Sequence, residues 1–319
     1  MAIFWAIVFI ISLVALVKGT DWFLQSSETI GFALGLSPFI IGIIIVGLGT
    51  SLPELLSSIV ATLQGVTDVP VANAVGSNIA NILLIVGIAA VIGKRLAVTR
   101  SLIELDLPLL AISTAIVIGV LWDGAVSTLE AVLLIAAFLV HLHYSIYYKE
   151  EVRQAPAPPV PESGTPPRKK RITQKDVALL VIGLLGLVLG AKYLIDAVVQ
   201  LSRIFNIATG VIAASAVALG TSLPELSVSI AAARRHKPEI VLGNIFGSNA
   251  FNVLMVIGLP GLFGTLTVDA QTLTIGIPTM AIATLFFVIS GISQRIYLWE
   301  GALYLMLYVL FIGKLFGVL

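Results

Sequence analysis

The sequence has few of the residues that soluble proteins use for reactive chemistry and for solvation. None of the 319 residues is cysteine, which excludes disulfide scaffolds, thiol nucleophiles and cysteine-bound zinc or iron-sulfur centres. Charged residues make up only 11% of the chain, whereas about 25% is typical of a soluble domain. The 18 basic residues are balanced by 17 acidic residues, so no basic surplus exists to neutralise a phosphate backbone. We therefore expect no nucleic-acid partner.

The chain is instead rich in continuous apolar sequence, and 58% of its residues are hydrophobic. Segments such as 2–16, 79–92 and 302–312 lack the strict alternation of an outer-membrane barrel strand. Because a spanning helix needs about 20 residues, the sequence predicts an all-α membrane protein in a lipid bilayer. We expect ten transmembrane helices, at 2–24, 38–63, 71–92, 104–121, 126–148, 176–199, 207–232, 239–263, 271–292 and 297–317.

The composition changes abruptly between the fifth and sixth predicted helices. This stretch contains a Pro-rich run at 155–167 and a basic cluster at 168–171, which together indicate a solvated linker. The predicted organisation is a first five-helix repeat at 1–148, a linker at 149–175 and a second five-helix repeat at 176–319. Most of the 18 basic residues lie in the linker and in loops on the same predicted side. The positive-inside rule then places the linker in the cytoplasm and both termini outside.

The two sides of the linker carry the same motifs, separated by a constant offset. The heptapeptide Gly-Thr-Ser-Leu-Pro-Glu-Leu occupies 49–55 and again 220–226. A second pair, with Gly-Ser-Asn at its centre and asparagine at both ends, occupies 73–81 and 244–252. Because each copy has five helices, the second must enter the membrane from the opposite side. The sequence thus predicts an inverted-topology repeat, which in transporters places the substrate site near the midplane.

The heptapeptide places an acidic residue deep in each copy. Glu54 and Glu225 lie well inside predicted helices, where an acidic side chain costs roughly 2.5–3.5 kcal/mol. In each copy a threonine four residues earlier shares the helix face and a serine adds another hydroxyl. Pro53 and Pro224 cannot donate to the carbonyl four residues earlier, so they free helix carbonyls at membrane depth. Hard oxygen donors of this kind suit calcium, whereas zinc or copper would require nitrogen or sulfur.

The second motif pair allows two interpretations. The Gly-Ser steps at 76–77 and 247–248 either line the site or let helices approach closely. Beside the glutamate motifs we favour site lining. Asn81 and Asn252 either bind ions or form interhelical hydrogen bonds, and the sequence does not decide between these roles.

Two pairs of opposite charges lie near predicted helix ends. Lys18 and Asp21 are three residues apart, and Lys192 and Asp196 are four apart. This spacing predicts local ion pairs with a structural role, so we place them outside the site.

These motifs resemble those of the sodium/calcium exchangers of the cation/calcium antiporter superfamily, specifically their compact prokaryotic branch. The resemblance rests on both motif pairs, in their order and spacing, and it extends over the chain apart from the linker. It implies a ten-helix exchanger in a prokaryotic cell membrane, in which the second, third, seventh and eighth helices hold the ions. The first and sixth helices would slide across that core.

The resemblance also implies a set of ligands. Calcium would bind Thr50, Glu54, Thr221 and Glu225, whereas sodium would use the same glutamates with other groups. Those sodium or shared ligands would be Ser51, Ser77, Asn81, Ser222, Ser248, Asn252 and the carbonyls of Gly47 and Ala218. Some relatives carry an aspartate at one of the late asparagine positions, but both are amides in this chain.

The leading hypothesis is a secondary antiporter, not an enzyme, that exports calcium in exchange for sodium entry. It would need no cofactor and no obligatory protein partner, with calcium and sodium as its substrates. A calcium/proton antiporter is the nearest alternative because a buried glutamate can carry a proton, but the Thr-Ser pairs favour sodium. A passive cation channel would also have intramembrane acids and broken helices. An intramembrane hydrolase is disfavoured, because the predicted helices lack paired catalytic aspartates and a histidine-metal motif.

Overall fold

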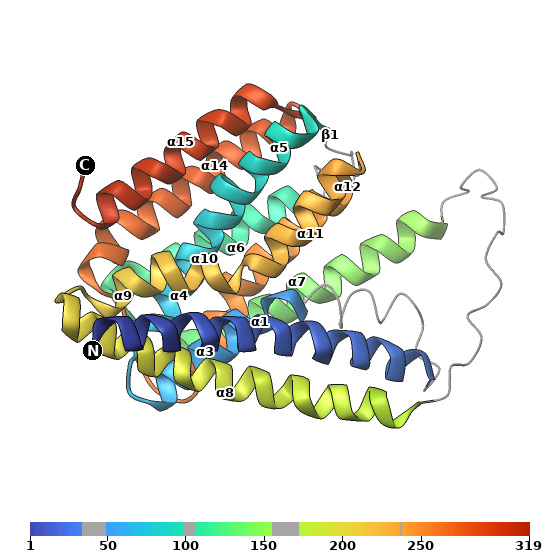
Figure 1. The fold of residues 1–319 in the computed structure, drawn as a ribbon. Coiled ribbons are helices and arrows are strands. Elements are labelled where there is room, and N and C mark those ends of the chain that lie inside the picture. Colours follow the sequence, from blue (N-terminus) through green and yellow to red (C-terminus); the bar gives the residue numbers. More distant parts are fainter. Residues whose placement is uncertain (34–48, 98–105, 155–171, 237) are drawn as a thin grey trace.

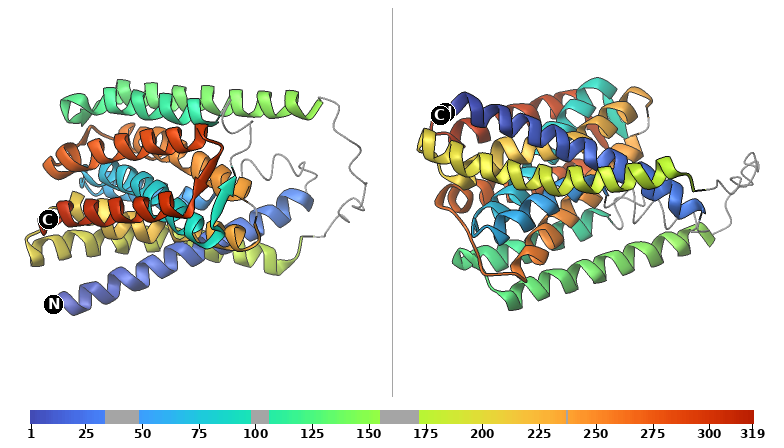
Figure 2. Two further views of the ribbon diagram at one scale, coloured as in Figure 1. Left: turned by 90° about the horizontal axis from the view of Figure 1, so that it is seen from above. Right: turned by 60° about the horizontal axis from the view of Figure 1, so that its bottom comes forward.

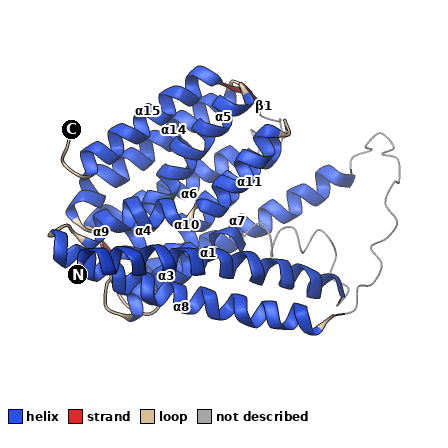
Figure 3. Cartoon of the chain, viewed as in Figure 1, coloured by secondary structure: helices blue, strands red, loops and turns tan. Residues whose placement is uncertain are grey.

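The computed structural model describes residues 1–33, 49–97, 106–154, 172–236 and 238–319. The described residues form a bundle of helices with four very short strands (Figure 1, Figure 3). The α-helices are α1 (Ala2–Ala33), α3 (Leu52–Leu63), α4 (Val69–Ile79), α5 (Gly87–Gly93), α6 (Leu107–Val120), α7 (Thr128–Gln154), α8 (Gln174–Phe205), α9 (Thr209–Ile212), α10 (Ala218–Thr221), α11 (Leu223–Arg234), α12 (Pro238–Phe251), α13 (Ile257–Gly261), α14 (Ile277–Ile292) and α15 (Leu298–Leu315).

Short tightened or widened turns connect several of these helices without breaking the path of the chain. The 3₁₀ turns are η2 (Gly49–Ser51) and η5 (Leu121–Asp123). The π-helical turns are η3 (Ala80–Val86), η6 (Ala213–Val217), η7 (Asn252–Val256) and η8 (Thr272–Gly276). As a result α4, η3 and α5 run on as one long apolar helix, as do α12, η7 and α13.

Seven helical runs in the described part of the chain are long and apolar enough to cross a bilayer. An eighth arises if the segments Thr209–Thr221 and Leu223–Arg234, which are bent by 46°, form one span. The prediction of an all-α membrane protein is therefore confirmed. Of the predicted helix at 38–63, residues 38–48 lie outside the described residues, and its remainder is η2 and α3.

The core centres on α4 and α12, while α1 lies at the periphery. All eleven residues of α4 are buried, including the polar residues Asn73, Ser77 and Asn78. Helix α1, by contrast, exposes Ile3, Ile7, Ile10 and Val14, as expected of a face in contact with lipid. The views in Figure 2 place α1 beside α8 along one face of the bundle and α7 across the bundle from them.

The pairing of α1 with α8 depends on glycine. A Cβ atom at Gly183 would lie 2.6 Å from the backbone nitrogen of Phe23, and one at Gly190 would lie 2.8 Å from that of Leu16. No side chain fits at such distances, so the two backbones lie in direct contact. This is the small-residue packing that lets membrane helices associate closely.

Two pairs of short antiparallel strands connect distant parts of the chain. Strand β1 (Arg95–Ala97) pairs with β4 (Arg295–Tyr297), and β2 (Ala125–Val126) pairs with β3 (Leu266–Thr267). The backbone nitrogen of Thr267 also donates to the carbonyl of residue 67 at 3.1 Å. None of these strands was predicted from the sequence.

One of the two predicted ion pairs is present. Lys18 Nζ lies 3.0 Å from Asp21 Oδ2 and confirms the first pair. The second prediction was wrong, because Lys192 Nζ lies over the ring of Tyr193, 5.4 Å from its centroid. Asp196 instead accepts a hydrogen bond from Gln64 Nε2 at 3.0 Å, since α3 packs against α8 and provides a neutral donor.

The predicted linker at 149–175 is described only at its two ends. Helix α7 continues to Gln154, six residues beyond its predicted end, and α8 begins at Gln174. A capping box starts α8, in which Thr173 N donates to Asp176 Oδ2 at 2.8 Å and Asp176 N donates to Thr173 Oγ1 at 3.3 Å. Residues 155–171 lie outside the described residues.

Candidate functional site

The first heptapeptide contains the change from a 3₁₀ turn to an α-helix. Gly49, Thr50 and Ser51 make the 3₁₀ turn η2, and α3 then begins with Pro53 in its first turn. Proline suits this position because the first N–H groups of a helix have no intrahelical acceptor. Glu54 follows directly and is fully buried.

The second heptapeptide is broken at the corresponding point. Helix α10 ends at Thr221, and α11 begins at Leu223, after the single residue Ser222, with Pro224 in its first turn. Ser222 N donates to the carbonyl of Ala218 at 3.1 Å. The Ala218 carbonyl, a predicted sodium ligand, therefore already accepts a backbone hydrogen bond. Glu225 is 1% exposed. In both motifs an α-helix therefore begins at the residue before the proline, and in the second motif the helix that precedes this break is also described.

The two motifs contact each other crosswise. Ser51 Oγ donates to Glu225 Oε1 at 3.1 Å, and Ser222 Oγ donates to Glu54 Oε1 at 3.0 Å. The threonine that precedes each serine lies beside the same carboxylate. Each glutamate is thus close to hydroxyl groups of the other copy. Six predicted site residues, which are the two glutamates, the two serines and the two threonines, form one buried cluster.

The second oxygen of each carboxylate has no such partner. Glu54 Oε2 and Glu225 Oε2 are buried without a hydrogen-bond donor, as are Ser77 Oγ and Asn81 Oδ1. Among the described residues, no basic side chain forms an ion pair with either glutamate. Burying unpaired charge costs several kcal/mol per ion, so these carboxylates require a positive charge or a proton.

Ser248 adds a further donor to one of the carboxylates. Ser248 Oγ, on α12, donates to Glu225 Oε1 at 3.3 Å. Its counterpart Ser77 is equally buried, but the side-chain hydroxyl of Ser77 makes no hydrogen bond. The glycine before it, Gly76, packs so closely on η6 that a Cβ atom would lie 2.2 Å from the carbonyl oxygen of Ala214. The glycine of the first Gly-Ser step therefore provides close helix contact, whereas the site-lining role of Ser77 stays a prediction.

The late asparagines differ from each other. Asn81 Nδ2 donates to Asn249 Oδ1 at 2.9 Å, which is the interhelical hydrogen bond left open by the sequence. Both amide atoms of Asn252 are buried without a partner. Gly47, the last predicted ligand, lies outside the described residues.

The first asparagine of each motif has a role that was not predicted from the sequence. Asn73 Nδ2 donates to the carbonyl of Glu54 at 3.3 Å, and Asn244 Nδ2 donates to the carbonyl of Glu225 at 3.5 Å. These equivalent contacts fix the backbone that carries each carboxylate. Their repetition in both copies was the signal that could have identified them.

The donor set is composed of carboxylate, hydroxyl, carbonyl and amide oxygens. The described residues contain no group of three or more His, Cys, Asp or Glu side chains that could hold a metal ion. Oxygen ligands that include carboxylates suit calcium. Buried ionisable residues inside a helical membrane bundle are typical of ion-transport proteins, and the chain has the features of that class.

Comparison with known proteins identifies the family. The chain belongs to the sodium/calcium exchanger protein family, whose model matches residues 4–147 and 175–316. This match confirms the predicted family. Members of the family are transmembrane antiporters.

Relatives and solved structures cover nearly the whole chain. The sodium/calcium exchanger MaX1 of Methanosarcina acetivorans is 32% identical over 343 aligned residues, covering 97% of this chain and 98% of that protein. The inner membrane protein YrbG of Escherichia coli is 31% identical and covers 87% of this chain and 86% of that protein. A structure of the sodium-calcium exchanger NCX_Mj, soaked with sodium and strontium, matches with a TM-score of 0.66 and 30% identity. It covers 98% of this chain and 99% of the matched chain.

Proposed function

We propose that this protein exchanges calcium for sodium across a cell membrane through a site centred on Glu54 and Glu225. The observation that supports it best is the pair of buried carboxylates, each with one oxygen lacking a hydrogen-bond partner. Two negative charges balance one calcium ion or two sodium ions. Occupation by one kind of ion would therefore exclude the other, and this exclusion would couple the two fluxes.

The proposed calcium ligands are the glutamates together with Thr50 and Thr221. Sodium would use the same glutamates with nearby hydroxyl, amide and carbonyl oxygens. The proposed sodium or shared ligands are Ser51, Ser77, Asn81, Ser222, Ser248, Asn252 and the carbonyls of Gly47 and Ala218. The burial of every described member of this set supports the assignment.

The proposed architecture is ten transmembrane helices in two inverted five-helix repeats, at 1–148 and 176–319, joined by the linker. The crosswise hydrogen bonds of Ser51 and Ser222 support this arrangement, because two copies related by a two-fold axis would make equivalent contacts. We also propose that both termini lie outside a prokaryotic cell membrane, with the basic linker in the cytoplasm.

The names of relatives are consistent with this function. MaX1 is called a sodium/calcium exchanger, and the matched structures belong to a sodium-calcium exchanger soaked with sodium, calcium or strontium. The Thr-Ser step in each motif favours sodium as the coupling ion, since a proton needs no hydroxyl ligands.

The test is calcium flux in vesicles that contain the purified full-length protein, with sodium, potassium and pH gradients imposed separately. A sodium gradient should drive calcium movement, and Glu54→Gln or Glu225→Gln should reduce it to the level of empty vesicles. Glu130→Gln is the matched control, because Glu130 caps the start of α7 and accepts from Ser127 N at 2.8 Å. It should transport as the unmodified protein does.

Two results would reject the proposal in different ways. Calcium flux that a pH gradient drives equally well without sodium would assign proton coupling. Flux that unlabelled calcium on the opposite side does not stimulate would indicate a channel, because only a carrier must return its site before the next cycle.

A further inference from the structure

We propose that a groove between α14 and α15 binds phosphatidylethanolamine, with its amine at Glu300 and an acyl chain along α15. The groove has a volume of about 620 Å³ and shares no residue with the proposed ion site. Its lining is mostly apolar, with a few polar groups. The lining residues are Phe286, Ile289, Ser290, Glu300, Leu303, Tyr304, Met306, Leu307 and Leu310.

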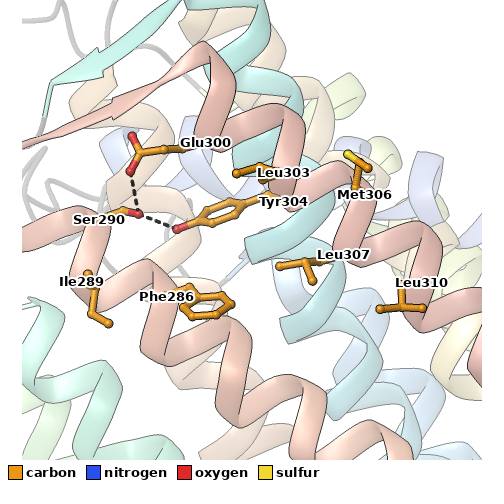
Figure 4. Close-up of a pocket in the computed structure, with 9 residues that line it drawn as sticks. All are labelled: Phe286, Ile289, Ser290, Glu300, Leu303, Tyr304, Met306, Leu307 and Leu310. Carbon is orange, nitrogen blue, oxygen red and sulfur yellow. Dashed lines mark hydrogen bonds between the residues drawn. The ribbon is translucent and has the colours of Figure 1, made fainter.

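The polar groups gather at one end of the groove (Figure 4). Tyr304 Oη donates to Ser290 Oγ at 2.9 Å, and Ser290 Oγ donates to Glu300 Oε1 at 3.2 Å. The other carboxylate oxygen, Oε2, accepts from Tyr297 N at 2.7 Å. These hydrogen bonds hold the carboxylate in place, so a negative charge lies at the end of an apolar groove.

That charge has no cationic partner in the part of the chain that the structure describes, where the ion pair found is Lys18 with Asp21. Each carboxylate oxygen has two lone pairs, so Glu300 can still accept further donors. A ligand with a protonated amine at one end would complement it. A quaternary ammonium group would do so less well, because it has no N–H to donate.

The position of the groove favours a lipid over a soluble amine. Trp299 is 77% exposed and Tyr297 is 46% exposed, and aromatic side chains of this kind gather at the membrane interface. From Glu300 to Leu310, α15 rises about 15 Å at roughly 1.5 Å per residue. This length is half of a hydrocarbon core that is about 30 Å thick. The groove therefore runs from the headgroup level to the bilayer centre, which is the length of one acyl chain.

The experiment is native mass spectrometry of the purified full-length protein with equal amounts of dioleoyl phosphatidylethanolamine and dioleoyl phosphatidylcholine. These lipids differ only in the methyl groups that replace the amine hydrogens. The unmodified protein should retain phosphatidylethanolamine about tenfold better, as expected for a charge-assisted hydrogen bond. Glu300→Gln keeps an acceptor for the helix cap but removes the charge, so the preference should fall to about onefold.

Two further variants separate the groove from the helix cap. Glu130→Gln makes the same change at the capping glutamate of α7, where Ser127 Oγ donates to Glu130 Oε2 at 2.7 Å, and should keep the preference. Leu307→Trp fills the apolar part and should reduce retention of both lipids. If Leu307→Trp does not fold, the comparison of Glu300→Gln with Glu130→Gln decides the question alone.

The proposal is overturned if the unmodified protein retains both lipids equally or retains neither. It is also overturned if Glu300→Gln keeps the full preference, or if Glu130→Gln loses it to the same extent. None of these outcomes depends on the transport of calcium or sodium.

Discussion

Replacement of Gly76 by alanine should separate two helices at the centre of the protein. The added Cβ atom would lie 2.2 Å from the carbonyl oxygen of Ala214, whereas ordinary contacts begin at 3.4 Å. Helix α4 and the turn η6 would have to separate by about 1.2 Å, because both partners are backbone and neither can rotate away. Overpacking of this kind costs roughly 1–3 kcal/mol, and we expect the upper end of that range.

Thermal unfolding of the detergent-solubilised protein measures this effect. A loss of about 3 kcal/mol should lower the midpoint by on the order of 6–10 °C. Gly243→Ala, on α12, is the matched control, because nothing lies within 4 Å of its added Cβ atom. It should leave the midpoint unchanged or raise it, since alanine favours a helix by about 1 kcal/mol over glycine.

The same variant should weaken calcium exchange. A displacement of about 1.2 Å at α4 would move the adjacent Ser77, which is one of the proposed sodium or shared ligands. If Gly76→Ala has the same unfolding midpoint and the same calcium exchange rate as Gly243→Ala, the close contact between α4 and η6 does not position the site.

Three further changes test separate contacts. Asn73→Ala removes the donor to the carbonyl of Glu54 and should lower stability by about 1–3 kcal/mol, measured by thermal unfolding; an unchanged midpoint would show that this contact is unimportant. Ser222→Ala removes a donor to Glu54 and should raise the sodium concentration for half-maximal exchange severalfold in the vesicle assay, with a smaller effect on calcium. A larger effect on calcium would contradict the proposed ligand sets. Gly183→Val adds a side chain whose Cβ atom would lie only 2.6 Å from Phe23 N. The yield of folded protein, measured by size-exclusion chromatography, should therefore fall sharply; a normal yield would contradict the close packing of α1 on α8.

Helix positions were largely predictable from the sequence, because apolar length determines them. The ninth predicted helix, 271–292, is found as η8 and α14 over Thr272–Ile292. The π-helical turns could not be predicted, since their residues have the same apolar composition as the neighbouring α-helices. Nor could the strands, because a pair of two or three residues forms only where the rest of the fold brings the segments together.

The members of the site were predictable, but their partners were not. Repetition identified Glu54 and Glu225, yet a repeat does not reveal how its two copies face each other. The hydrogen bond from Ser51 crosses to the glutamate of the other copy, 174 residues away. A sequence can predict such a contact only after the packing of the helices is known, and the same limit left the role of Asn73 unassigned.

The short strands restrict how this molecule can move. The pair β1–β4 joins the segment after α5 to the segment before α15, and β2–β3 joins the opposite end of the bundle. If the first half of the chain moved along the second by a single residue, the registers of β1–β4 and β2–β3 would both be broken. The two strand pairs therefore act as clamps that hold the central helices in place. Neither clamp includes α1 or α8, whose glycine contact makes them one rigid pair. A movement of this pair against the other helices would therefore leave both clamps intact.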